Sequence, residues 1–201
     1  MTALRSPLRV AVLASGGGSN LQAITDYLDG LGDAGAARVV LVASDRAGAG
    51  ALQRAARMNV PGVVLSQPTD GPALEALLSA NRIDLVVLAG YLKLVPAEIT
   101  RRWAGRIINI HPALLPKFGG AGMYGKRVHA AVIAAGETES GATVHQVNDE
   151  FDRGAIIAQE RVAVVPGDTP ETLAARVLEA EHSLYPRTVQ SLALELSRTP
   201  R

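Results

Sequence analysis

The chain has 201 residues, 48% of them hydrophobic and 19% charged, which fits one soluble globular domain. Its 20 Lys and Arg nearly balance its 19 Asp and Glu, so the strongly basic surface typical of nucleic-acid binding is disfavoured. The absence of cysteine excludes disulfides, zinc–thiolate sites and thiol catalysis, and no apolar run has the length of a membrane span. We therefore expect a cytoplasmic protein, a monomer or homodimer, with small-molecule substrates and neither nucleic-acid nor membrane partners.

Two arginines and a short apolar run within residues 1–14 superficially resemble a signal peptide. The apolar run, residues 10–14, is too short for that purpose and leads directly into three glycines. We interpret it as the first strand of the core.

Short apolar runs alternate with helical segments along the first half of the chain. The pattern predicts strands at 9–14, 38–43, 63–65, 85–89 and 107–110, and helices at 20–28, 50–58 and 72–80. Fully apolar runs such as 85–89 are typical of strands covered on both faces. Alternation of this kind indicates an α/β fold, in which a mostly parallel twisted sheet carries helices on both faces.

The character of the sequence changes after residue 111. Residues 111–126 are rich in Gly and Pro and without helical or strand period, and such a long loop in a compact domain is usually functional. A helix at 127–135, strands at 142–147 and 156–164 and a final helix from 169 past 196 are predicted next, with Asp168 or Thr169 as its N-cap and Pro170 near its first position. Without repeats or linkers, the chain is expected to form one domain, residues 1–201, with halves of about 1–105 and 106–201.

A glycine-rich turn, SGGGSN at residues 15–20, joins the first strand to the first helix. Free N–H groups at such a helix start bind phosphate, although a tight turn without any ligand has the same composition. Asp45, just past the second strand, stands where a dinucleotide site has its ribose-binding acid. Leu21, however, occupies the place of the third glycine of that fingerprint, so we favour a monophosphate pocket.

Two polar residues, Asn109 and His111, end a strand that is otherwise apolar. Residues two apart share a face of a strand, so these two side chains point the same way while Ile108 and Ile110 point the other, and Pro112 ends the strand. Ligands of open α/β sheets bind at the carboxyl ends of strands, where the glycine-rich turn also lies. Catalysis and a purely structural anchoring of the following loop both explain this pair.

An acidic segment at residues 148–154 follows the strand predicted at 142–147. Acids in a loop closed by Gly are usually turn residues and solvated charges. We expect the preceding strand to run parallel to the first strand, which would bring one of these carboxylates to the sheet edge of His111. His145 is more typical of a packed, hydrogen-bonded histidine than of a catalyst, and His129 and His182 carry no strong signal.

Five segments together resemble the folate-dependent formyltransferases over residues 10–186: SGGGSN (15–20), DLVVLAGYLKLV (84–95), GRIINIHPALLPKFGG (105–120), GATVHQVNDEFDRG (141–154) and EAEHSLYP (179–186). The NIHPALLP run is specific for formyl transfer. The resemblance implies a Rossmann-like formyltransferase fold, 10-formyltetrahydrofolate as cosubstrate, and no metal. The SGGGSN and EHSLYP segments point to members that formylate the amine of N1-(5-phosphoribosyl)glycinamide in de novo purine (IMP) biosynthesis.

The resemblance also implies roles for matching positions. The catalytic residues would be Asn109, His111 and Asp152. The residues that bind the ribonucleotide would be Gly18, Ser19, Asn20 and Glu181. The residues that line the folate pocket would be Leu92, Lys93, Leu94, Val95, Asn109, Asn148, Asp149, Glu150, Phe151 and Asp152.

Two departures from the family pattern leave roles open. Relatives often carry a folate-contacting arginine before the fourth strand, and residues 67–73 contain none. The loop after Pro116 is longer than in some relatives, which leaves the roles of Lys126, Arg127 and His129 open.

In the implied reaction the amine attacks the formyl carbon, and Asn109 and a protonated His111 donate hydrogen bonds to the formyl oxygen. Asp152 would hold the pKa of His111 up and help move the proton of the amine. Three alternatives stay open: a formyltetrahydrofolate hydrolase, whose relatives usually carry an extra N-terminal domain; methionyl-tRNA formyltransferase, which has a further C-terminal domain; and a non-catalytic nucleotide-binding module. The last leaves Asn109 and His111 unexplained.

Overall fold

The structure, a computed structural model, describes residues 6–198. Its strands are β1 (Leu8–Leu13), β2 (Ala37–Ser44), β3 (Gly62–Val64), β4 (Leu85–Leu88), β5 (Ile107–His111), β6 (Glu139–Gln146) and β7 (Ile156–Ala163). Its helices are α1 (Ser19–Gly30), α2 (Gly50–Arg57), α3 (Gly71–Ala80), α4 (Ala97–Arg102), α5 (Lys126–Ala134) and α6 (Pro170–Arg198), with a 3-10 turn η1 (Gly32–Ala34). Residues 1–5 and 199–201 lie outside the described residues. Both stretches belong to the expected 1–201 domain, and residues 1–5 also belong to the segment considered as a signal peptide.

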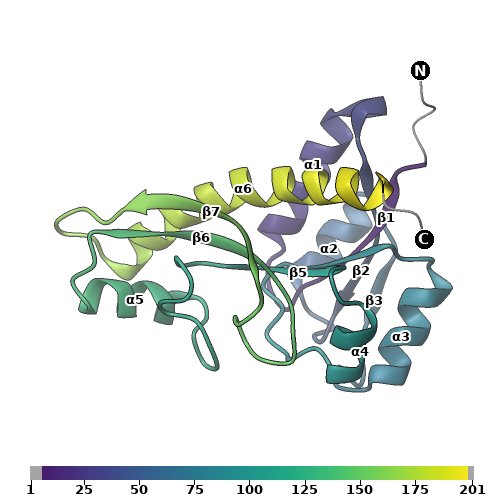
Figure 1. The fold of residues 1–201 in the computed structure, drawn as a ribbon, viewed down its shortest axis with the longest axis horizontal. Helices are drawn as coiled ribbons and strands as arrows, with labels where there is room; N and C mark the ends of the chain where they lie inside the picture. The colour runs from purple at the N-terminus through teal and green to yellow at the C-terminus, as the bar shows by residue number, and fades with distance from the viewer. Residues whose placement is uncertain (1–5, 199–201) are drawn as a thin grey trace.

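The seven strands form one sheet in the order β3-β2-β1-β4-β5-β6-β7 (Figure 1). Strands β1 to β5 pair in parallel, whereas β6 pairs antiparallel with β5, and β7 pairs antiparallel with β6. The predicted α/β fold with a mostly parallel sheet is confirmed. The strand order reverses between β1 and β4, and the crevice at such a reversal is where open α/β sheets bind ligands.

Alternate residues of the central strands supply two separate cores. Val10 and Val12 of β1 belong to a cluster completed by α1, α2 and α6 on one face of the sheet. Ala11 and Leu13 belong to the cluster formed with α3 and α4 on the other face. Both faces are therefore dry, which explains why the central strands are continuously apolar.

The long helix α6 is fixed to the middle of the sheet by a buried tyrosine. The Tyr185 hydroxyl lies 2.9 Å from the carbonyl oxygen of Leu88 and 3.1 Å from that of Ile108, and it donates to these two acceptors at β4 and β5. Because Glu181 precedes Tyr185 by one helical turn, this anchor also sets where the Glu181 carboxyl meets the sheet edge.

Three sequence-based expectations about elements need correction or addition. Observed ends differ by a few residues from the predicted ones, and β6 begins at Glu139 rather than at residue 142. Helix α4 and the turn η1 were not predicted, because six and three residues are too short to show a helical period. The N-cap of α6 is Thr169, whose hydroxyl accepts from the Thr172 N–H, and Pro170 is the first helical residue as predicted.

The expectation that the strand before the acidic segment runs parallel to β1 is wrong. Residues 112–138, with α5, stay near the carboxyl edge of the sheet, so the chain re-enters from that edge and β6 runs back along β5. The acidic segment consequently begins at the far end of β5, beside Ile107, whose carbonyl oxygen accepts from the Val147 N–H. It returns toward the site as the connection between β6 and β7.

Candidate active site

A cavity of about 430 Å³ lies at the carboxyl edge of the sheet, beside the ends of β4 and β5. Its lining includes residues 92–95 after β4, Asn109 and His111 of β5, residues 150–152 of the β6–β7 connection, Asn20 of α1, and Glu181 of α6. The cavity therefore brings residues of both halves of the chain together near the reversal of strand order.

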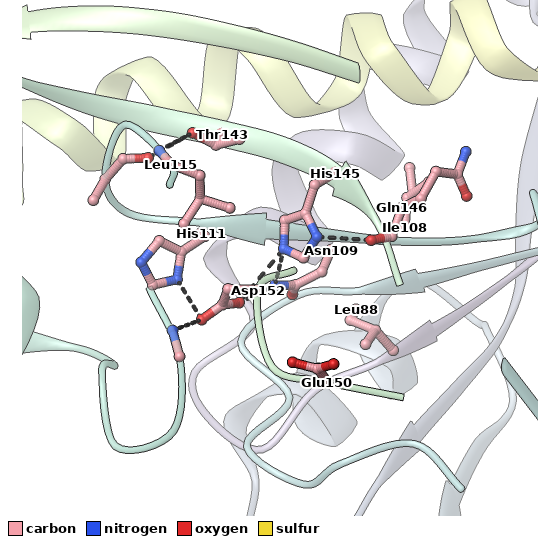
Figure 2. Close-up of polar contacts among 12 residues, drawn as sticks. Leu88, Ile108, Asn109, His111, Leu115, Thr143, His145, Gln146, Glu150 and Asp152 are labelled. Atoms are coloured by element: carbon pink, nitrogen blue, oxygen red, sulfur yellow. Dashed lines mark hydrogen bonds and ion pairs between the residues drawn. The ribbon is translucent and has the colours of Figure 1, made fainter. Parts of the chain in front are cut away.

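Asn109 and His145 form a directly opposed pair across β5 and β6. The Asn109 Nδ2 atom donates to His145 Nε2 at 3.0 Å, and His145 Nδ1 donates to the Gln146 carbonyl oxygen at 2.8 Å (Figure 2). The His145 side chain is buried, so the interpretation of His145 as a packed, hydrogen-bonded histidine is confirmed.

The Asp152 carboxylate lies between two imidazole rings (Figure 2). Its Oδ2 atom is 3.3 Å from His111 Nδ1 and accepts the Gly120 N–H at 2.9 Å. Its Oδ1 atom is 3.5 Å from both His145 Nε2 and Asn109 Nδ2. Asp152 thus contacts both of the other residues that the family resemblance marked as catalytic.

This contact depends on two backbone conformations that side-chain-bearing residues seldom adopt. Asp152 has φ 56° and Phe118 has φ 57°, both in the left-handed region. Gly119 lets the two loops approach, because an added Cβ would lie 2.5 Å from Leu115 Cδ2 and 3.1 Å from Asp152 Cβ. Such conformations persist only where surrounding contacts compensate their cost.

Both ring nitrogens of His111 face acceptors. Nε2 donates to the Phe118 carbonyl oxygen at 2.8 Å, and Nδ1 faces Asp152. Only the imidazolium can donate to both.

Burial nevertheless lowers the pKa of His111, and the Asp152 charge and the Phe118 carbonyl oppose this only in part. The expectation of a pKa held up is therefore wrong in net direction, although Asp152 acts with the expected sign. Burial raises the pKa of Asp152, but the hydrogen bond with His145, the charge of His111 and the Gly120 N–H outweigh it, and that pKa is lowered.

Glu181 forms a second acidic group in the lining of the cavity. It is 8% exposed, and Asn20 Nδ2 donates to its Oε2 atom at 2.6 Å. Burial raises the pKa of Glu181 to about 7, against the effect of the Asn20 hydrogen bond. The Asn20 Oδ1 atom is buried without a hydrogen-bond partner within the described residues.

The glycine-rich turn leads into the start of α1, where no side chain caps the backbone N–H groups. Gly18, the N-cap of α1, has φ 76°, and a Cβ there would come within 2.8 Å of Ala51 Cα in α2. Gly18 is thus required both for its left-handed conformation and for the close approach of α2. The Ser15 hydroxyl accepts the Leu92 N–H at 2.9 Å, which links this turn to the segment after β4.

The structure separates the expected site residues into those that line the main cavity and those that do not. Residues 92–95 and 150–152 line it, whereas Asn148 and Asp149 line a second depression that also contains Arg101. Gly18 and Ser19 lie outside the lining of the main cavity. Asp45, considered for a dinucleotide ribose, lies outside it as well, with its carboxylate 3.8 Å from Arg46.

Sequence reasoning missed two backbone groups and left the roles of three side chains open. The Phe118 carbonyl and the Gly120 N–H complete the hydrogen bonds of His111 and Asp152, and no side-chain pattern marks them. Lys126 and His129 line the main cavity, whereas Arg127 stacks its guanidinium over Tyr124 at 5.2 Å. The unusual glycine content of residues 117–125 was the available signal for this loop.

Within residues 6–198 no three His, Asp or Glu side chains are grouped as a metal site would require. Over the same range, none of the helices combines the length and the apolarity that crossing a bilayer takes.

Comparison with known proteins gives consistent results. The formyl transferase family profile matches residues 8–189. The chain is 43% identical to a chloroplastic phosphoribosylglycinamide formyltransferase of Arabidopsis thaliana, covering 93% of this chain and 66% of that protein. It is 44% identical to part of the trifunctional purine biosynthetic protein adenosine-3 of Drosophila pseudoobscura pseudoobscura, covering 92% of this chain and only 14% of that protein. The crystal structure of phosphoribosylglycinamide formyltransferase from Anaplasma phagocytophilum superposes with a TM-score of 0.85 at 37% identity, covering 94% of this chain and 87% of the other.

Replacing Glu181 by Gln should stabilise the protein at alkaline pH. Burial raises the pKa of Glu181 to about 7, so ionisation of this one carboxyl lowers the free energy of unfolding progressively as the pH rises from the ordinary carboxyl pKa to about 7. Glutamine does not ionise. The difference in unfolding free energy between Glu181→Gln and the wild type should therefore be more favourable to the variant at pH 8 than at pH 5, by about 2 kcal/mol. Urea unfolding at both pH values measures this, and an equal effect at the two would contradict the raised pKa.

Proposed function

The chain belongs to the formyl transferase family, and from this membership we propose that it transfers the formyl group of 10-formyltetrahydrofolate to the amine of N1-(5-phosphoribosyl)glycinamide. The reaction belongs to de novo purine (IMP) biosynthesis. The observation that carries the proposal is the meeting of Asn109, His111 and Asp152 in one cavity with Asn20 and Glu181. The cysteine-free sequence is consistent with the cytoplasmic location that the proposal includes.

In this reaction the amine nitrogen bonds to the formyl carbon, and the carbonyl electron pair moves onto the formyl oxygen. Asn109 Nδ2 has two hydrogens, of which one serves His145 at 3.0 Å and the other faces Asp152 at 3.5 Å, longer than a good hydrogen bond. The second hydrogen is therefore available to the oxyanion. A well-placed donor of this kind typically contributes about a hundredfold to a thousandfold in rate.

His111 is the second donor, and its partners define how it can act. Since Nε2 already donates to the Phe118 carbonyl, the formyl oxygen competes with that carbonyl for the same hydrogen. Charge that grows on the formyl oxygen makes it the better acceptor and favours the protonated ring, which burial alone disfavours.

Asp152 handles the proton of the attacking amine. The lowered pKa keeps its carboxylate ionised at neutral pH, so it accepts the amine proton directly or through one water. When the tetrahedral adduct collapses, the bond between the formyl carbon and N10 of the folate breaks, and N10 takes up that proton. The products are the formylated amide and tetrahydrofolate, with atoms and charge balanced.

The two substrates occupy different parts of the cavity in this proposal. The pterin lies against residues 92–95 and 150–152, where Lys93 supplies a positive charge that residues 67–73, without an arginine, do not. Glu181 binds the ribose hydroxyls, and the N–H groups of Gly18, Ser19 and Asn20 bind the phosphate at the start of α1.

Incubation with 10-formyltetrahydrofolate, with and without the ribonucleotide, tests the proposal. Tetrahydrofolate and formylated ribonucleotide should appear in equal amounts, and only when both substrates are present. Release of formate at the same rate without the ribonucleotide would instead identify a formyltetrahydrofolate hydrolase, and no reaction would favour a binding module.

Replacing Gly18 by Ala should raise KM for the ribonucleotide by about tenfold or more, while KM for the folate stays nearly constant. The cause is the left-handed φ of 76° and the approach of Ala51, which together displace the backbone N–H groups that hold the phosphate. Gly16→Ala is the matched control, because a Cβ there has nothing within 4 Å. Steady-state kinetics of both variants would refute the phosphate role if both KM values rose together.

Replacing Asp152 by Asn should lower kcat about a hundredfold and lower the pKa of His111 further. Asparagine keeps the shape and can still accept the Gly120 N–H, but it removes the charge that opposes burial at His111. Asp149→Asn is the control on the same loop, since its carboxylate is 53% exposed and faces Arg101. An Asp152→Asn enzyme with normal kcat and an unchanged His111 titration by NMR would rule the pairing out, and Asp149 or Glu150 would become the candidates.

A further inference from the structure

His129 is a buried histidine of α5 that the proposed mechanism does not use. It is 4% exposed, it lines the main cavity, and its Nδ1 atom is buried without a hydrogen-bond partner in the described residues. The same helix also buries the apolar side chains of Val128 and Val132. A satisfied structural histidine would instead have both nitrogens paired.

The unpaired nitrogen carries an energetic cost. A buried polar atom that loses water and gains no partner destabilises the fold, so such atoms are few, and those that face a cavity are explained by a partner that enters it. Burial and the positive charge of His111 both lower the pKa of His129, so its ring is neutral near pH 7. A neutral ring has one N–H and one lone pair, and with the proton on Nε2 the Nδ1 atom is an acceptor.

The position of His129 identifies the side of the cavity that it serves. The cavity lining includes Lys126 of α5 and Ala174, Leu178 and Glu181 of α6, and α5 packs against α6. His129 therefore lies on a helix that packs against the helix carrying Glu181, which the proposal assigns to the ribonucleotide. Its charge coupling to His111 places it close to the reacting groups as well.

We propose that His129 is a binding residue for the amine substrate, with Nδ1 accepting a hydrogen bond from an N–H of the glycinamide segment. This inference rests on the proposed function and deepens it. The glycinamide carries N–H donors on both its amine and its amide, and an acceptor directed at one amine N–H leaves the nitrogen lone pair free to attack the formyl carbon. The same contact orients the amine between Glu181 and His111.

Two substitutions of His129 distinguish binding from a structural role. His129→Leu fills the same space without a polar atom, whereas His129→Asn keeps an oxygen near the place of Nδ1. For His129→Leu, KM for the ribonucleotide should rise about fivefold to tenfold with KM for 10-formyltetrahydrofolate within about twofold, because one buried hydrogen bond is lost. His129→Asn should recover most of that loss. The melting temperature of His129→Leu without substrates should equal or exceed that of the wild type, since an unpaired buried atom is removed.

Each alternative outcome overturns the inference. A KM for the ribonucleotide that is the same in the wild type and His129→Leu, or a larger effect on the folate, would do so. Equal losses in the Leu and Asn variants together with a lowered melting temperature would assign His129 to the core instead. Direct calorimetric titration with the ribonucleotide gives the same comparison for any variant too slow to assay. If the wild type formylates the ribonucleotide and His129→Leu is unaffected, the inference fails while the proposed function stands.

Discussion

The Asp152 carboxylate is only 9% exposed, and a negative charge so far from water is costly unless donors surround it. The polar groups around it come from distant parts of the chain: His111 from β5, His145 from β6 and the Gly120 N–H from the loop before α5. The carboxylate is tolerated only while all three are in place. The antiparallel course of β6, the close approach at Gly119 and the left-handed backbone of Asp152 are the local conditions that keep them there.

The sequence predicts the elements of the sheet well because periodicity and burial are local properties. The alternation along β5 is an example: Ile108 and Ile110 belong to one core, and Asn109 and His111 face the other way, as predicted. The direction of β6 was predicted wrongly because it depends on the edge of the sheet to which residues 112–138 bring the chain. A loop without periodicity carries no such information. The prediction that the pKa of His111 is held up failed for a related reason. Burial has the larger effect on this pKa, and burial depends on the packing of loops that only the tertiary structure fixes.

Several features of the site lower stability. Phe118 and Asp152 hold left-handed conformations, the Glu181 carboxyl is buried with a pKa of about 7, and Asn20 has an unpaired buried oxygen. Each contrasts with the dry clusters on both faces of β1, where apolar side chains pack against one another. Features of this kind gather at functional sites, where groups are held ready for a ligand at the expense of stability.

In the proposed reaction, the lowered pKa of His111 is an advantage. A ring that was always protonated would bind the neutral formyl oxygen and the oxyanion with a full charge in both cases, and such uniform binding does not accelerate the chemical step. A ring that burial keeps uncharged before the reaction takes up a proton from solvent as the oxyanion forms, with Asp152 on its other side, and releases it when the adduct collapses. The attraction is then greatest in the transition state, where stabilisation raises kcat. Burial of His111 and the charge of Asp152 therefore act together, and removing either one would disturb the balance that the other depends on.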